Sequence, residues 1–112
     1  MKNISGKVVR GIQKGRKLGF PTANIKVNFD LDFGIYAGHI IIAGKKYNSA
    51  IYSPGDKIIE AFIFDFSGDL YDKKVGVEII KKIRDKKNFK SDAEAIKQIT
   101  KDISKIKKLL EK

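Results

Sequence analysis

Segments in which apolar and polar residues alternate run through much of the chain. The clearest spans residues 22–29, where Ile25, Val27 and Phe29 alternate with polar side chains. A two-residue period is that of a β-strand with one buried face, so we expect a strand here. Together with this one, five or six short strands are expected, the others at residues 5–12, 35–43, 46–52, 57–66 and 74–83.

The segment 57–66 is apolar on both faces, so we expect it to be covered on both sides. Glu60 is the exception, because it is in phase with Phe62, Phe64 and Phe66. An ionised carboxylate is rarely buried alone, since its loss of hydration is costly. Glu60 therefore either pairs with a lysine at the end of the strand or lies at the mouth of a pocket and acts as a base.

Residues 91–110 change to a helical period. Ser91 as N-cap and Glu94 three residues later form a capping box. The apolar side chains form one stripe, which comprises Ile96, Ile99, Ile103, Ile106 and Leu110. We expect this helix to pack on the outside of the sheet. Residues 1–112 are therefore predicted to form a single, mainly β domain, a small closed antiparallel barrel with one C-terminal helix.

The formal net charge is +11, with 24 basic and 13 acidic residues. Such a charge is a common sign of nucleic-acid binding. Only Arg10, Arg16 and Arg84 are arginine, however, which is the residue that base-edge and stacking contacts favour, and the lysines are scattered. We expect an anionic small substrate, steered by this field, rather than nucleic acid as the main partner.

Cysteine is absent, which excludes a disulfide framework, a thiolate metal site and a cysteine nucleophile. The first residues lack the apolar core of a signal peptide, and no apolar run has the length of a membrane span. We expect a cytoplasmic monomer without a membrane partner. His39, the only histidine, is expected to be structural, since no acid or second histidine lies near it in the sequence.

The stretch after the first expected strand concentrates backbone freedom and positive charge. Gly11, Gly15 and Gly19 recur at four-residue spacing, and Arg16 and Lys17 lie between them. Glycine lets backbone N–H groups approach an anion closely, and the two cations add charge there. The spacing matches neither the P-loop pattern nor the dinucleotide fingerprint. A glycine-rich turn between two strands is therefore the alternative to a phosphate-binding loop.

Pro21 ends this flexible part, because its ring restricts the backbone, and a strand follows. Thr22 and Asn24 are two residues apart, so their side chains share one face of that strand. A hydroxyl and an amide oxygen beside phosphates suit Mg²⁺ or another hard divalent ion. We therefore predict a site for a metal-bound polyphosphate.

These residues carry a resemblance to a known family. Residues 11–24, GIQKGRKLGFPTAN, resemble the signature of the riboflavin kinases, also called flavokinases. The segments GIYAG (34–38), IEAFIFDFSGDLYD (59–72) and IRDKKNFKS (83–91) resemble later blocks of the family in the same order. The likeness covers nearly the whole chain. It implies a six-stranded Greek-key barrel with the helix beside it, as a stand-alone kinase domain.

The resemblance implies transfer of the γ-phosphate of ATP to the ribityl 5′-hydroxyl of riboflavin, which gives FMN and ADP. Glu60 would be the general base, and Thr22 with Asn24 would hold Mg²⁺. The nucleotide would be bound by Gly11, Gly15, Arg16, Lys17, Gly19, Pro21 and Thr22, with Tyr36 and Tyr71 near the adenine.

For the flavin, the resemblance points to Arg84, Asp85 and Phe89. Arg84 and Asp85 would hydrogen-bond the polar edge of the ring, and Phe89 would pack against the isoalloxazine. The alternatives are a surface ion pair between Arg84 and Asp85, worth little, and a core position for Phe89 beneath the helix.

The chain departs from the family pattern at two places. The segment before the Glu60 strand is the short IYSPGDK, and Asp72 follows Tyr71 where the family has glycine. We also find no counterpart of the adenylyltransferase domain often fused to bacterial flavokinases, so FAD synthesis is not expected. A catalytically impaired flavin- or nucleotide-binding module is therefore a second hypothesis, and a basic nucleic-acid-binding barrel is a third.

Overall fold

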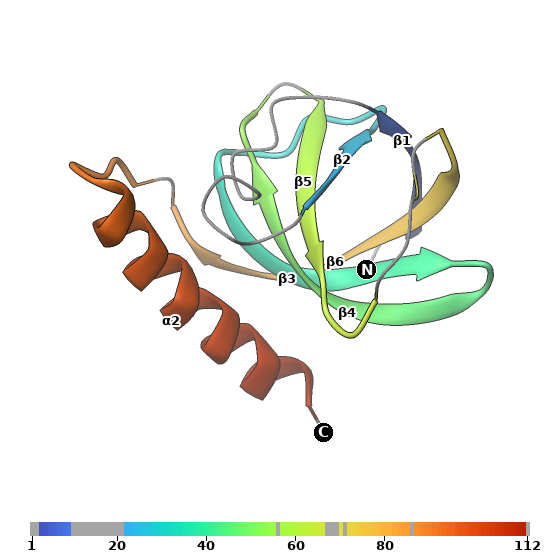
Figure 1. Ribbon diagram of the computed structural model, residues 1–112. Coiled ribbons are helices and arrows are strands. Elements are labelled where there is room, and N and C mark those ends of the chain that lie inside the picture. Colours follow the sequence, from blue (N-terminus) through green and yellow to red (C-terminus); the bar gives the residue numbers. More distant parts are fainter. Residues whose placement is uncertain are drawn as a thin grey trace.

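The expected strands close on one another into a barrel with a helix outside its wall (Figure 1). The computed structural model describes residues 3–9, 22–55, 57–66, 70, 72–85 and 87–111. Its elements are β1 (Asn3–Val9), β2 (Ala23–Lys26), β3 (Gly34–Ile42), β4 (Lys45–Ser53), β5 (Ile58–Ile63), β6 (Lys74–Arg84) and α2 (Asp92–Leu110).

All neighbouring strands are antiparallel, in the order β1-β2-β5-β4-β3-β6 around the closed barrel. Strands β3, β4 and β5 pair in sequence, and β6 returns to lie beside β3. This arrangement is a Greek key. The prediction of a six-stranded Greek-key barrel with one C-terminal helix is confirmed.

Alternation along the strands divides their side chains between the interior and the outer face. Ile25 on β2 and Ile59 and Ala61 on β5 point into the barrel, so Asn24 and Glu60 lie on its outer face. The buried interior consists of Val8, Ile25, Val27, Tyr36, Ile40, Ile51, Ile59, Ala61, Ile63, Leu70, Val75 and Val77. Alternation thus places the polar Asn24 and Glu60 on the outer face, which also carries the apolar Phe62.

Two strands are shorter than their patterns predict. Strand β2 ends at Lys26, because its partner β5 begins directly opposite at Ile58. Strand β5 ends at Ile63, and the chain then turns at Phe64 and Asp65, where Asp65 takes a left-handed φ of 57°. The apolar pattern continues past the ends of both strands. The backbone hydrogen bonds of the sheet end earlier, because the neighbouring strand no longer runs alongside.

Helix α2 lies against the outer surface of β3 and β4 (Figure 1). Ile106 packs there with Ala37 and Phe64, and Ile103 and Leu110 border this second cluster. The Ser91 hydroxyl accepts a hydrogen bond from the Glu94 N–H, as the capping box predicts. The predicted stripe is wrong at Ile96, which is 38% exposed, because the N-terminal turns of the helix extend past the apolar cluster.

A buried ion pair joins the helix to the barrel. Arg84 at the end of β6 donates hydrogen bonds of 2.8 to 3.0 Å to both carboxylate oxygens of Asp102 on α2. Gln98 donates a further one to Asp102, at 3.0 Å. Since Asp102 is 5% exposed, these bonds replace the water that its carboxylate loses.

Gly38 marks a close approach of two backbones. The β3–β6 register shifts between Ala37 and Gly38. A Cβ on Gly38 would collide with the Glu78 carbonyl oxygen and would lie 2.8 Å from Ile51 Cδ1. Glycine is therefore required here to keep β3 and β6 paired.

We expect Gly38→Ala to lower the free energy of unfolding by about 1–3 kcal/mol, because a backbone carbonyl cannot move aside. Urea denaturation measures this difference. Gly76→Ala is the matched control, since the atoms nearest to a Cβ there belong to the Ile41 side chain and lie 3.0 Å away or more, so no backbone carbonyl is in the way. Equal losses in the two variants would contradict the interpretation.

We expect Asp102→Ala to lower the free energy of unfolding by about 3 kcal/mol, because it leaves the Arg84 guanidinium largely buried without its partner. Asp85→Ala serves as control. It breaks only the exposed Lys82–Asp85 pair and should change stability little. Similar denaturation midpoints for wild type and Asp102→Ala would show that the pair does not hold the helix.

Candidate active site

Thr22, Asn24 and Glu60 come together on the outer face of the barrel. Antiparallel pairing of β2 with β5 sets Asn24 directly opposite Glu60. Thr22, just before β2, donates a hydrogen bond from its hydroxyl to Glu60 Oε1 over 3.1 Å. Asn24 is 3% exposed and Glu60 8% exposed. The register thus assembles a buried carboxylate, a hydroxyl and an amide from strands far apart in the sequence.

One end of the Asn24 side-chain amide is unsatisfied among the described residues. Its Nδ2 is buried and has no hydrogen-bond partner among the described residues. Because the two ends of a side-chain amide are assigned from hydrogen bonding, an unpaired end can equally present its oxygen. A buried polar atom without a hydrogen-bond partner costs free energy, so it marks a position where contact with a ligand or ion would be stabilising.

The residues present fit a hard divalent cation. The Thr22 hydroxyl can donate to Glu60 and still offer a lone pair, and the Asn24 amide can supply a second oxygen. In the part of the chain that the structure describes, no group of three His, Cys, Asp or Glu side chains could hold a metal. A cation here would therefore need further oxygens from a substrate or water, which is the usual situation of Mg²⁺.

Tyr52 is a member of this group that the sequence analysis missed. The β4–β5 register sets Tyr52 directly opposite Glu60. Burial, and then the charge of Glu60, raise the pKa of the Tyr52 phenol, and the charge of Arg84 lowers it. Its sequence neighbourhood contains no signal of a site, because only the pairing of β4 with β5 brings it to Glu60.

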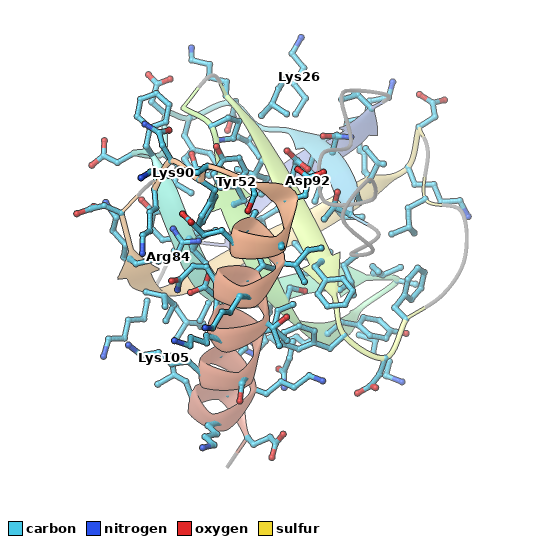
Figure 2. All side chains as sticks on the ribbon, turned by 60° about the vertical axis from the view of Figure 1, so that its left-hand side comes forward. Lys26, Tyr52, Arg84, Lys90, Asp92 and Lys105 are labelled. Carbon is cyan, nitrogen blue, oxygen red and sulfur yellow. The ribbon has the colours of Figure 1, made fainter. Side chains whose placement is uncertain are left out.

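The same outer row continues to Arg84. Tyr52 lies opposite Ile35 on β3, and Ile35 lies opposite Arg84 on β6. Figure 2 shows Tyr52 and Arg84 on the side of the barrel where α2 begins, with Asp92 at the first turn of the helix. Residues opposite one another in antiparallel strands share a face of the sheet. The row therefore connects the Glu60 group to the end of β6.

Arg84, Asp85 and Phe89, predicted on the flavin side, lie close together. The Arg84 guanidinium is bound to Asp102, donates to the Asp85 carbonyl oxygen at 3.0 Å and stands 5.9 Å from the Phe89 ring centre. The Asp85 carboxylate is exposed and pairs with Lys82 at 2.7 Å, a hydrogen bond that lowers the pKa of Asp85. The alternative of an Arg84–Asp85 side-chain pair is replaced by Arg84–Asp102. The flavin roles stay predictions.

Tyr36, predicted near the adenine, is 6% exposed and belongs to the interior cluster. Its hydroxyl donates to the Asp32 carbonyl oxygen at 3.0 Å, and burial raises the pKa of its phenol. Its nucleotide role stays a prediction. The other predicted nucleotide residues lie outside the described residues, namely Gly11, Gly15, Arg16, Lys17, Gly19, Pro21 and Tyr71.

Asp72 adopts the backbone conformation that a glycine would favour at its position. Its φ is 68°, in the left-handed region, which aspartate tolerates better than most residues. Its N–H donates to the Val8 carbonyl oxygen at 2.9 Å, and its carboxylate pairs with Lys7 at 2.9 Å. Aspartate is therefore compatible with a left-handed turn here.

His39 has an acidic partner that its sequence neighbourhood does not contain. Its Nδ1 lies 2.6 Å from Glu78 Oε1 across the β3–β6 pairing. The hydrogen bond with His39, and then the charge of Lys46, lower the pKa of Glu78. The pair lies further along β3 than Ile35, so it does not belong to the Glu60 group.

Comparison with known proteins identifies the family. The family model described as "Flavokinase: Riboflavin kinase" matches residues 2–110. The RNA-binding riboflavin kinase RibR of Bacillus subtilis is 38% identical over 96% of this chain, which spans 51% of that protein. A bifunctional riboflavin kinase/FMN adenylyltransferase of Buchnera aphidicola is also 38% identical, over 95% of this chain and 38% of its own length. The chain thus spans about half or less of these relatives.

A solved structure supports the fold. The crystal structure of a macrolide-efflux protein from Streptococcus pneumoniae superposes with a TM-score of 0.80 and 30% sequence identity, over 91% of this chain and 37% of that one. No helix in the described ranges is long and apolar enough to cross a membrane. From the match over almost its whole length, the chain belongs to the flavokinase family, the riboflavin kinases.

Proposed function

We propose that the protein is a riboflavin kinase, which transfers the γ-phosphate of ATP to the 5′-hydroxyl of riboflavin and releases FMN and ADP. One observation carries the proposal: the Thr22 hydroxyl lies 3.1 Å from the buried carboxylate of Glu60, and Asn24, whose Nδ2 has no hydrogen-bond partner among the described residues, lies opposite Glu60. Family membership supports the same reaction.

Glu60 is the proposed general base. A primary hydroxyl is a poor nucleophile, so its proton must leave as its oxygen bonds to the γ-phosphorus. Glu60 accepts that proton, the bond from the γ-phosphorus to the β,γ-bridging oxygen breaks, and ADP leaves. The Thr22 hydroxyl donates a hydrogen bond to Glu60 Oε1 and so helps to hold the carboxylate in position.

Thr22 and Asn24 are the proposed protein ligands of Mg²⁺. When bound, the ion would offset negative charge on the phosphate oxygens of ATP. Thr22 is suited to two tasks, because its O–H orients Glu60 while its lone pairs remain available. The glycine loop, with Arg16 and Lys17, is proposed to hold the phosphates, and the net charge of +11 would attract them.

On the acceptor side, Arg84, Asp85 and Phe89 are proposed to bind the flavin ring. Since the Arg84 guanidinium is held by Asp102, it would act from a fixed position. The left-handed backbone of Asp72 removes one reason to expect an impaired enzyme. We further propose that the domain acts as a monomer in the cytoplasm.

With purified protein, ATP, Mg²⁺ and riboflavin, we expect FMN and ADP in equal amounts, measured by chromatography. Glu60→Gln should lower kcat by about a hundredfold, with little change in flavin affinity, because it removes the proton acceptor but keeps the shape. Glu94→Gln on the exposed first turn of α2 is the matched control. A near-normal rate for Glu60→Gln would remove Glu60 from the mechanism.

Thr22→Ala should weaken the use of Mg·ATP by about tenfold, because one metal oxygen and the hydrogen bond that orients Glu60 are lost together. Titration calorimetry of ADP with and without Mg²⁺ measures the metal-dependent part directly, without turnover. Thr22→Ser keeps the hydroxyl and should stay near wild type. If both variants bind Mg·ADP like wild type, Thr22 is not a ligand.

A further inference from the structure

Tyr52 occupies the middle of the row that connects the two halves of the candidate site. It faces Glu60 on one side, in the β4–β5 register. On the other side, it faces Ile35, which in turn faces Arg84. Neighbouring strands are about 4.8 Å apart. A substrate that extends from Arg84 to Glu60 along this row must therefore cross Tyr52.

The phenol of Tyr52 is suited to contact a polar substrate. Its side chain is half-buried, and no hydrogen bond joins its hydroxyl to another residue in the described ranges. Tyr36 differs, because its hydroxyl is satisfied by the Asp32 carbonyl oxygen. Burial and the Glu60 charge raise the pKa of Tyr52, so the phenol stays neutral and able to donate near pH 7.

We propose that Tyr52 positions the acceptor, by donating its phenol hydrogen to one secondary hydroxyl of the ribityl chain while the terminal hydroxyl faces Glu60. This inference rests on the proposed function. A flexible polyol chain carries several hydroxyls of similar reactivity. One fixed hydrogen-bond donor beside Glu60 would determine which hydroxyl reaches the base. Tyr52 would therefore be a specificity-determining residue.

The geometry distinguishes this role from simple packing. The Tyr52 side chain shares its face with Glu60, away from the barrel interior that holds Ile51. Removing only the phenol oxygen therefore leaves the interior unchanged. Tyr47, on the same strand, packs its ring against Phe66 at 5.3 Å between centroids and lies nearer the other end of β4.

We expect Tyr52→Phe to raise the KM for riboflavin about fivefold with a small change in kcat, since one neutral hydrogen bond is lost. Direct riboflavin affinity, from quenching of flavin fluorescence, should weaken to the same extent. Chromatography should also detect phosphate esters at other ribityl hydroxyls, which a purely structural residue would not produce. Tyr47→Phe is the matched control and should show none of these changes, and thermal melting verifies that both variants fold.

Riboflavin analogues that each lack one secondary hydroxyl test the contact from the substrate side. For one analogue, wild type should lose about fivefold in affinity, whereas Tyr52→Phe should lose nothing further. Non-additivity of this kind identifies the two partners.

Other outcomes separate the two proposals. Suppose that wild type forms FMN and that Tyr52→Phe shows the same KM, the same riboflavin affinity and the same phosphate esters. This result would overturn the role of Tyr52 and leave the kinase function standing. The same holds if only Tyr52→Ala is impaired, since the ring alone would then matter. Absence of FMN formation by folded wild-type protein would overturn the proposed function, and the inference with it.

Discussion

The pairing of β5 with two neighbours is the constraint on which the candidate site depends. Strand β5 lies between β2 and β4, and its register holds Glu60 between Asn24 and Tyr52. Side chains alternate between the faces of a strand, so a slip of one residue would turn Glu60 into the apolar interior. The backbone ladders therefore set the position of the carboxylate, and side-chain contacts such as that of Thr22 refine it.

The two faces of the barrel wall have different tasks. The interior is filled by aliphatic side chains, which stabilise the closed sheet through their burial. On the outer face of β2 and β5, Asn24 and Glu60 are nearly as buried, yet polar. Such groups are costly without partners. The rigidity of the closed barrel is what can hold them in place for a ligand.

Helix α2 completes the outer face on the side of β3 and β4. Its apolar contacts to Ala37 and Phe64 are supplemented by the Arg84–Asp102 pair, which fixes the direction of the guanidinium at the end of β6. The helix is therefore more than a cover for apolar surface. Through Asp102, the helix holds the Arg84 guanidinium in place at the end of the row of outer residues that begins at Asn24.

The sequence by itself determined the elements and the faces of their side chains. Alternation predicts the strands, Ser91 with Glu94 marks the start of the helix, and the two-residue period sets Thr22 and Asn24 on one face. These features are local, since they depend on the chain's own period and caps. The resemblance around residues 11–24 added the expected roles.

Only the tertiary structure decided which residues meet. Glu60 accepts a hydrogen bond from Thr22, Arg84 donates to Asp102, and His39 pairs with Glu78. In each pair the two residues lie far apart in the sequence. Tyr52 carries no sequence signal, and it reaches Glu60 through the β4–β5 register alone. Register depends on how distant segments pair and bury their apolar faces together, which a local pattern does not specify.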